Sequence, residues 1–247
     1  MFQNTKALVL REVRYKEADR ILTVLSDTGG KMTVKARGAL RKGSRLTAAT
    51  QQLTYAEMTL FGNKGKYTVN EASIVEDFAG LRSDISELSL GCYFAECAEA
   101  MAVEDQPDAE LLQLTLNSLY ALSKGLCDSR QIKAAFELRL ASIAGYTPDL
   151  SGCCVCGKSD PERPILSLTD GKIVCADCRN AAVERPLRLE NDTLKAMRYI
   201  VNAPPKKLFS FHTEDRCLKE LSDAAESYFL IQADRRFASL DYWRKLT

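Results

Sequence analysis

Two pairs of cysteines restrict the folding of this chain more than any other feature of its sequence. Cys153 and Cys156 form one Cys-x-x-Cys pair, Cys175 and Cys178 form the other, and 18 residues separate the pairs. Two residues between thiolates allow a tight turn that directs both sulfurs at one ion, and this double spacing is typical of four-thiolate zinc sites. Because four thiolates leave no coordination position open, we expect a structural Zn²⁺ site rather than a catalytic one.

Other interpretations of these cysteines remain open. The thiols could be reduced and buried without a metal, and Cys154 could compete with Cys153 for the ion. A redox-active pair is disfavoured because no strand–helix–strand pattern surrounds either Cys-x-x-Cys. The 247 residues contain nine cysteines, no apolar leader and no membrane-length apolar run. This combination favours reduced thiols in a cytoplasmic protein without a membrane partner.

The first 80 residues have the pattern of short strands separated by turns. In residues 31–37, Met32, Val34 and Ala36 alternate with polar residues and would face a core. Glycine-containing turns at 27–30 and 62–65 favour hairpins. Strands are predicted over residues 5–13, 21–25, 31–37, 53–61 and 66–72. Five strands at this spacing predict a small barrel such as the OB-fold over residues 1–80.

From residue 83 the spacing of apolar residues changes to three and four, which is typical of amphipathic helices. Ser83 could cap the first of them. Helices are predicted over residues 83–99, 107–125, 129–145, 191–202 and 214–245, the last with a break near Gln232. We expect the first three to form a bundle. The predicted fold class is therefore α+β: an N-terminal OB-fold barrel and an α-helical domain over 81–247, interrupted by a four-cysteine zinc finger over 151–180.

A basic tract lies in the barrel region. Residues 1–80 carry thirteen Lys and Arg against eight Asp and Glu, and no acidic residue lies between Asp27 and Glu57. Six cations fall within fifteen positions: Lys31, Lys35, Arg37, Arg41, Lys42 and Arg45. A strand with cations on its outer face, followed by a flexible glycine-containing loop, could follow a phosphate backbone. The alternative is a solvated edge strand whose lysines prevent aggregation.

Aromatic residues in the same region could stack on bases, although aromatic residues of small barrels more often belong to the core. The candidates are Tyr15, Tyr55, Phe61 and Tyr67. We find no pattern for catalysis: His212 is the only histidine, and no glycine-rich phosphate loop is present. The sequence therefore indicates a binding protein rather than an enzyme, although a thiol oxidoreductase remains a more distant alternative.

Several motifs resemble those of the RecO family, in the family's order. They are the strands at residues 5–25, the basic stretch at 30–46, FELRL at 136–140, GYTPDL at 145–150, and Cys153-x-x-Cys156 with Gly157. The resemblance covers most of the chain. It implies an OB-fold, a helical domain with an inserted zinc finger, and a DNA-binding role for the six cations named above.

The resemblance also implies a non-enzymatic recombination mediator in DNA repair. Such a protein would bind single- and double-stranded DNA, anneal complementary strands, and work with RecR to load RecA on DNA coated by single-stranded-DNA-binding protein. It would be cytoplasmic and associated with the nucleoid. The alternative from another class is a zinc-ribbon adaptor that binds RNA or a protein.

Overall fold

The computed structural model describes residues 1–63, 65–178 and 183–247, and it confirms the predicted α+β fold class. Lys64 of the predicted turn and residues 179–180 of the predicted finger lie outside the described residues. The chain forms two compact units, the first made of Met1–Lys124 with Phe237–Thr247 and the second of Gly125–Arg236. The division into domains 1–80 and 81–247 stays a prediction.

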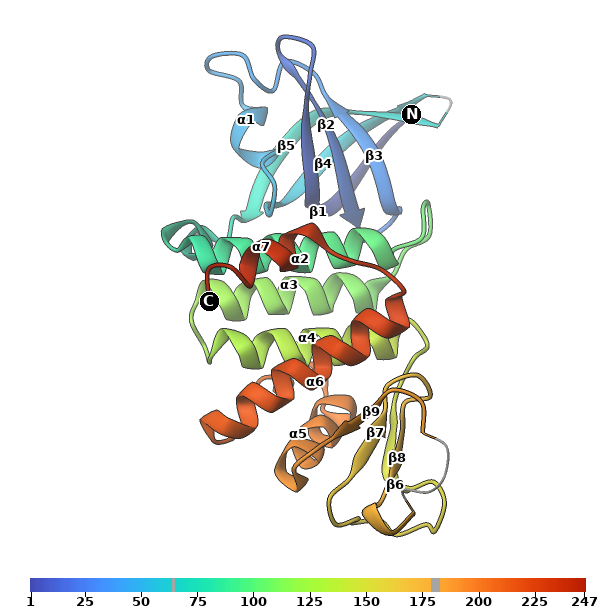
Figure 1. Ribbon diagram of the computed structural model, residues 1–247. Helices are drawn as coiled ribbons and strands as arrows, with labels where there is room; N and C mark the ends of the chain where they lie inside the picture. The colour runs from blue at the N-terminus through green and yellow to red at the C-terminus, as the bar shows by residue number, and fades with distance from the viewer. Residues whose placement is uncertain (64, 179–182) are drawn as a thin grey trace. The chain divides into compact units, whose positions relative to one another are not determined.

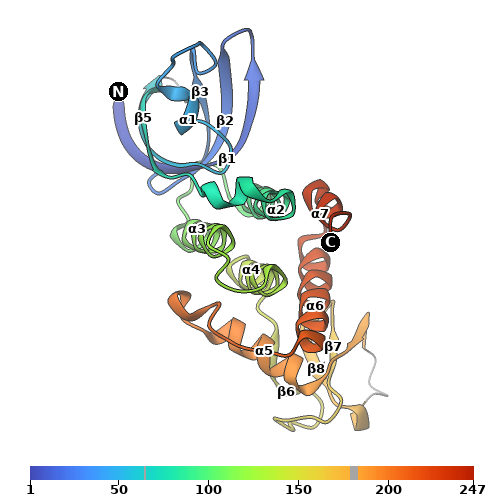
Figure 2. The same ribbon diagram turned by 90° about the vertical axis from the view of Figure 1, so that its left-hand side faces the viewer.

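A closed five-stranded barrel forms the N-terminal part of the first unit (Figures 1 and 2). Its strands are β1 (Phe2–Tyr15), β2 (Asp19–Ser26), β3 (Gly30–Ala36), β4 (Tyr55–Asn63) and β5 (Lys66–Glu76). Their order is β1-β2-β3-β5-β4, and the barrel closes because β1 pairs with both β2 and β4. The pair of β3 and β5 is parallel, and the short helix α1 (Leu46–Ala49) precedes β4. These features confirm the predicted OB-fold barrel.

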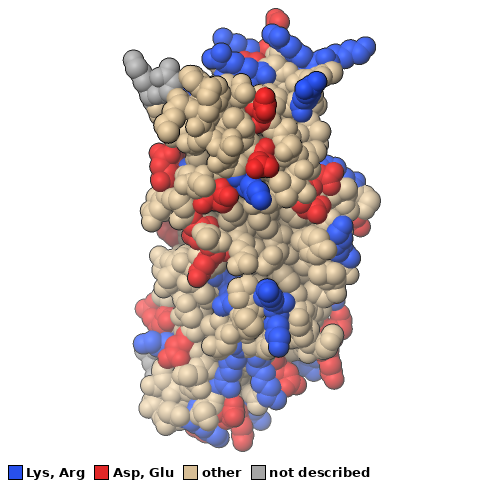
Figure 3. Space-filling view, turned by 180° about the vertical axis from the view of Figure 1, so that it is seen from behind, with Lys and Arg blue, Asp and Glu red and all other residues tan. Residues whose placement is uncertain are grey.

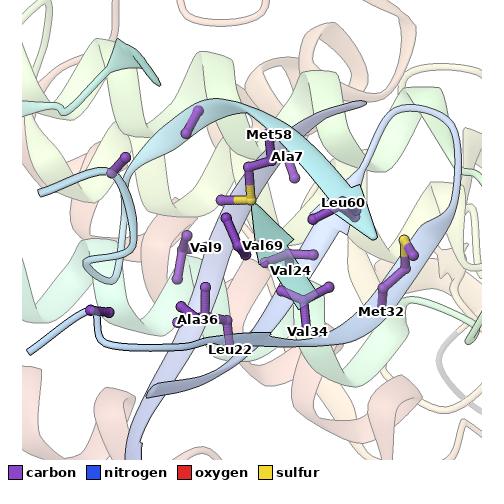
Figure 4. Close-up of a cluster of buried hydrophobic side chains, with 13 residues drawn as sticks. Ala7, Val9, Leu22, Val24, Met32, Val34, Ala36, Met58, Leu60 and Val69 are labelled. Atoms are coloured by element: carbon purple, nitrogen blue, oxygen red, sulfur yellow. The ribbon is translucent and has the colours of Figure 1, made fainter. Parts of the chain in front are cut away.

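The barrel encloses an aliphatic core that the strand alternation predicts. On β3 the residues Met32, Val34 and Ala36 are buried, while Lys31 and Lys35 on the opposite face are partly exposed. Figure 4 shows side chains from different strands pointing toward one another inside the barrel. Burial of each Val, Leu or Met side chain contributes roughly 1.5–3 kcal/mol, so this cluster holds the strands that carry the basic tract.

The first unit also contains helices, which are η1 (Ala79–Ser83), α2 (Ile85–Met101), α3 (Ala109–Ser123) and α7 (Ala238–Trp243). Of these, α2 packs against the barrel strands β1 and β2, and α3 and α7 pack on α2. The predicted cap of α2 was wrong by one residue. The Asp84 carboxylate accepts from the backbone N–H of Ser86 at 2.7 Å, whereas the Ser83 hydroxyl donates to the Gly80 oxygen and belongs to the preceding turn.

The second unit combines helices with a small sheet. Its helices are α4 (Ser129–Ile143), η2 (Ala176–Cys178), α5 (Asn191–Asn202), η3 (Pro205–Lys207) and α6 (Asp215–Ala233). Its strands, in sheet order, are β6 (Asp149–Cys153), β8 (Lys172–Val174), β7 (Ile165–Ser167) and β9 (Pro186–Arg188). Within this unit α4 packs with α5 and α6. The bundle of the first three helices stays a prediction, because α2 and α3 belong to the first unit and α4 to the second. None of the described helices is both long and apolar enough to span a bilayer.

Candidate nucleic-acid interface and metal centre

The basic loop, which we define as residues 37–45, connects β3 to α1. Its first half is tied to the β1–β2 hairpin. The backbone N–H of Gly38 donates to Asp19 Oδ1 at 2.8 Å, and that of Leu40 donates to the Ala18 oxygen at 2.9 Å. Ala39 is buried in the barrel core. The loop is therefore anchored, although the sequence predicted a flexible one.

Four of the six predicted DNA-binding cations lie on the basic loop with exposed side chains. These are Arg37, Arg41, Lys42 and Arg45. Gly38 and Gly43 have φ values of +64° and +76°, in the left-handed region that glycine adopts at least cost. The anchored glycine turn thus displays guanidinium and ammonium groups without burying them. Figure 3 shows Lys and Arg side chains gathered at the end of the barrel away from the helices of its own unit.

The other two predicted cations, on β3, have partners within the first unit. Lys31 Nζ donates to the backbone oxygen of Glu99 on α2 at 3.2 Å. Lys35 Nζ lies 2.8 Å from Asp19 Oδ2 and 4.8 Å from the centre of the Tyr15 ring. The hydrogen bonds from Lys35 and from the Gly38 backbone hold the pKa of Asp19 below its usual value. Asp19 is therefore ionised at neutral pH.

A groove of about 510 Å³ lies beside the basic loop on the barrel. Its lining combines aromatic, aliphatic, cationic and polar side chains: Phe2, Arg37, Leu46, Phe61, Lys66, Thr68, Val69 and Asn70. The rings of Phe2 and Phe61 are 59% and 42% exposed, and their centres are 5.2 Å apart. Exposed rings next to cations can stack on bases while the cations neutralise phosphates.

Sequence reasoning found only part of this groove. It named Phe61 and Arg37 but missed Phe2 and Lys66. Phe2 meets Phe61 because β1 and β4 pair in a register that sets these two residues opposite each other. A strand register of this kind cannot be read from either strand alone. Lys66 could have been found from its place directly after the predicted hairpin turn.

The other candidate aromatic residues lie outside the groove lining. Tyr15 is 43% exposed at the end of β1, with Lys35 over its ring. Tyr67 packs against the barrel core, as small-barrel aromatics commonly do. Tyr55 is half-buried, and burial raises the pKa of its hydroxyl. Among the four candidates, Phe61 is the one that the structure brings into the groove with exposed cations.

The metal centre unites the four predicted cysteines. The sulfurs of Cys153, Cys156, Cys175 and Cys178 all lie within 4.8 Å of one another, and those of Cys156 and Cys175 are 3.8 Å apart. A tetrahedral site with Zn–S distances of about 2.3 Å separates its sulfurs by about 3.8 Å, so the cluster fits zinc. Strand β6 ends at Cys153, and strand β8 ends directly before Cys175. Because the two strands are parallel neighbours in the sheet, they bring the two cysteine pairs together.

The environment of the thiols also suits a cation. Burial opposes ionisation of Cys153, but hydrogen bonds from the backbone N–H groups of Cys156, Cys175 and Val155 lower its pKa to about 6. The side-chain hydrogen bond with Cys175 is the largest cause, and burial the next, of a rise in the pKa of Cys178 to about 12. A low pKa at Cys153 beside a high pKa at Cys178 is the arrangement expected when the two thiols share a proton in a cluster that a divalent ion would hold ionised.

The structure also identifies which of two adjacent cysteines belongs to the cluster. Cys153 is buried and its sulfur lies with the three others of the cluster, whereas Cys154 is exposed and lies outside the group. Arg198 on α5 anchors the finger within the second unit. Its guanidinium donates to the Leu150 oxygen at 2.6 Å and pairs with Asp160 at 2.8 Å. The finger is therefore attached to the helices by a residue that the cysteine spacing does not reveal.

Comparison with known proteins gives matches over nearly the whole chain. The family model described as Recombination protein O N terminal matches residues 1–78, and the one described as Recombination protein O C terminal matches residues 82–241. The chain is 35% identical to the DNA repair protein RecO of Acetivibrio thermocellus over 245 residues, 99% of this chain and 97% of that protein. It is 33% identical to the DNA repair protein RecO of Clostridium novyi over 174 residues, 70% and 68% of the two chains. With the DNA repair protein RecO of Caldicellulosiruptor bescii it shares 28% over 240 residues, 97% of each.

Proposed function

Since the chain belongs to the RecO family of DNA repair proteins, we propose that its barrel binds single- and double-stranded DNA through the basic loop and the neighbouring groove. The observation that carries this proposal is the groove itself. It joins two exposed phenylalanine rings to Arg37 and Lys66, directly beside the loop that carries Arg41, Lys42 and Arg45. The cations would contact phosphates, and the rings would stack on unpaired bases.

Binding of this kind is insensitive to sequence, which suits an annealing protein. Cation–phosphate contacts read no base, and every base has a face that can stack on Phe2 or Phe61. Neutralising phosphates lowers the repulsion between two strands, so the same cations would promote the annealing of complementary strands. Double-stranded DNA would use the cations of the basic loop alone, because its bases are already stacked.

The metal centre has a separate role in this proposal. Cys153, Cys156, Cys175 and Cys178 would hold a structural Zn²⁺, which supplies a fold-stabilising cross-link between two turns of the finger. Four thiolates around one ion leave no position for a substrate. The zinc would therefore stabilise the second unit and take no part in chemistry.

In the cell, the protein would act as a non-enzymatic mediator in the cytoplasm, associated with the nucleoid. The family resemblance supports a role with RecR in loading RecA on DNA that single-stranded-DNA-binding protein covers. The anchored basic loop supports the DNA-binding half of this role, because it presents its cations without folding on binding.

The test compares nucleic acids of matched sequence. We expect the purified protein to bind single-stranded DNA and to accelerate annealing of complementary strands without a nucleotide, with a weaker effect on matched RNA. Preference for RNA, or binding of neither, would favour the alternative of a zinc-ribbon RNA-binding or protein-interaction adaptor.

A further inference from the structure

Asp19 is an acidic residue placed among the cations of the candidate DNA interface. It begins β2, and each of its carboxylate oxygens has a different partner. Oδ1 accepts from the backbone N–H of Gly38 at 2.8 Å, and Oδ2 pairs with Lys35 Nζ at 2.8 Å. The two side chains are only 18% and 26% exposed, and the Tyr15 ring lies 4.8 Å from the same ammonium group.

A carboxylate at this place has two opposing effects on DNA binding. Its negative charge repels phosphate. Its ion pair also keeps Lys35 from neutralising a phosphate and so from releasing the counterion bound there. Its hydrogen bond to Gly38, however, fixes the start of the basic loop, and a loop already held in position loses less conformational entropy on binding. The structure shows the contact that produces the second effect, the hydrogen bond from the Gly38 N–H to Asp19 Oδ1.

We propose that Asp19 is a positioning residue of the DNA interface, which anchors the basic loop through Gly38 and holds Lys35 as a latent phosphate contact. This inference rests on the proposed DNA binding. It predicts that Lys35 contributes little to DNA affinity in the native protein, although its charge lies next to the basic loop. It also predicts that replacing the Asp19 carboxylate by a neutral amide strengthens DNA binding.

The experiment uses the full-length, zinc-loaded protein and a single-stranded oligonucleotide, with affinity measured by fluorescence anisotropy at several salt concentrations. Asp19→Asn removes the ion pair but keeps a side-chain oxygen for the Gly38 N–H. Freed Lys35 should add one phosphate contact, so the slope of log affinity against log salt becomes steeper by about 0.7 and affinity at 0.1 M salt rises about fivefold.

A double-mutant cycle separates this effect from the simple loss of a negative charge. In a Lys35→Ala background, Asp19→Asn should change binding no more than the matched control Glu17→Gln, which removes an exposed acid from the same hairpin end. Lys35→Ala alone should leave the salt slope at its wild-type value. An equal gain from Asp19→Asn in both backgrounds would overturn the latent role of Lys35.

The anchoring role has its own comparison within the Lys35→Ala background. There Asp19→Ala, which cannot accept from Gly38, should bind DNA more weakly than Asp19→Asn and should exchange its Gly38 amide hydrogen faster. Equal affinity and equal exchange would overturn the anchor. If the wild type binds DNA with the predicted salt slope but the double-mutant cycle shows no coupling between Asp19 and Lys35, this inference alone is refuted. If the wild type does not bind DNA, the proposed function is refuted as well.

Discussion

Removing the three cations at the turn of the basic loop should reduce DNA affinity by an amount that the structure allows us to estimate. Arg41, Lys42 and Arg45 are exposed, and together with Arg37 and the groove residue Lys66 they would provide about five phosphate contacts. At about 0.7 counterions released per contact, the wild-type slope of log affinity against log salt for single strands should be near −3.5. Changing all three to Ala should reduce its magnitude by about 2 and lower affinity at 0.1 M salt about a hundredfold.

The assay is anisotropy of a labelled oligonucleotide across salt concentrations, repeated with several base sequences. The weakening should be the same for all sequences, because the lost contacts are to phosphate. A control with the same loss of charge is Lys206→Ala, Lys207→Ala and Lys219→Ala, three exposed lysines of the second unit. If the control reduces the slope and the loop variant does not, the DNA site lies outside the barrel and our reasoning is refuted.

Three further predictions concern the groove, the metal centre and a buried ion cluster. Phe61→Ala should weaken single-stranded DNA binding by about 1–3 kcal/mol without changing the salt slope, whereas Tyr242→Ala, at another exposed aromatic residue, should leave affinity unchanged. An altered slope would argue against stacking. Cys175→Ser should abolish zinc content and lower the melting temperature while the barrel still binds DNA, since structural zinc contributes on the order of 10 kcal/mol of apparent binding energy; metal analysis that finds no zinc in the folded wild type would contradict it. Lys133 is buried between Glu137 at 3.1 Å and Glu226 at 2.7 Å, so Lys133→Met should lower the free energy of unfolding by about 3–5 kcal/mol in urea titrations. The double variant Lys133→Met with Glu137→Gln should recover part of that loss, and no recovery would show that packing rather than buried charge determines the cost.

The elements that were predicted correctly from the sequence are those whose pattern lies within one short stretch of the chain. The alternation around Met32 and Val34 predicts a strand whatever surrounds it, and α5 begins and ends at the predicted residues 191 and 202. The four cysteines belong to the same class, because a two-residue spacer limits each pair to one tight turn. The cap of α2 shows the limit of such signals, since Ser83 and Asp84 are both good caps and the preceding turn decides between them.

The sequence by itself thus determined the barrel strands, the helices, the four thiols of the candidate metal centre and the region that carries the basic tract. The tertiary structure decided which of the six cations are exposed, because the partners of Lys31 and Lys35 come from other elements, Glu99 and Asp19. It also decided that Phe2 faces Phe61, and that α4 packs with α5 and α6. Periodicity and spacing report the conformation of neighbouring residues. Register, pairing and helix packing depend on the free energy of contacts between residues far apart in the chain, which no single segment encodes.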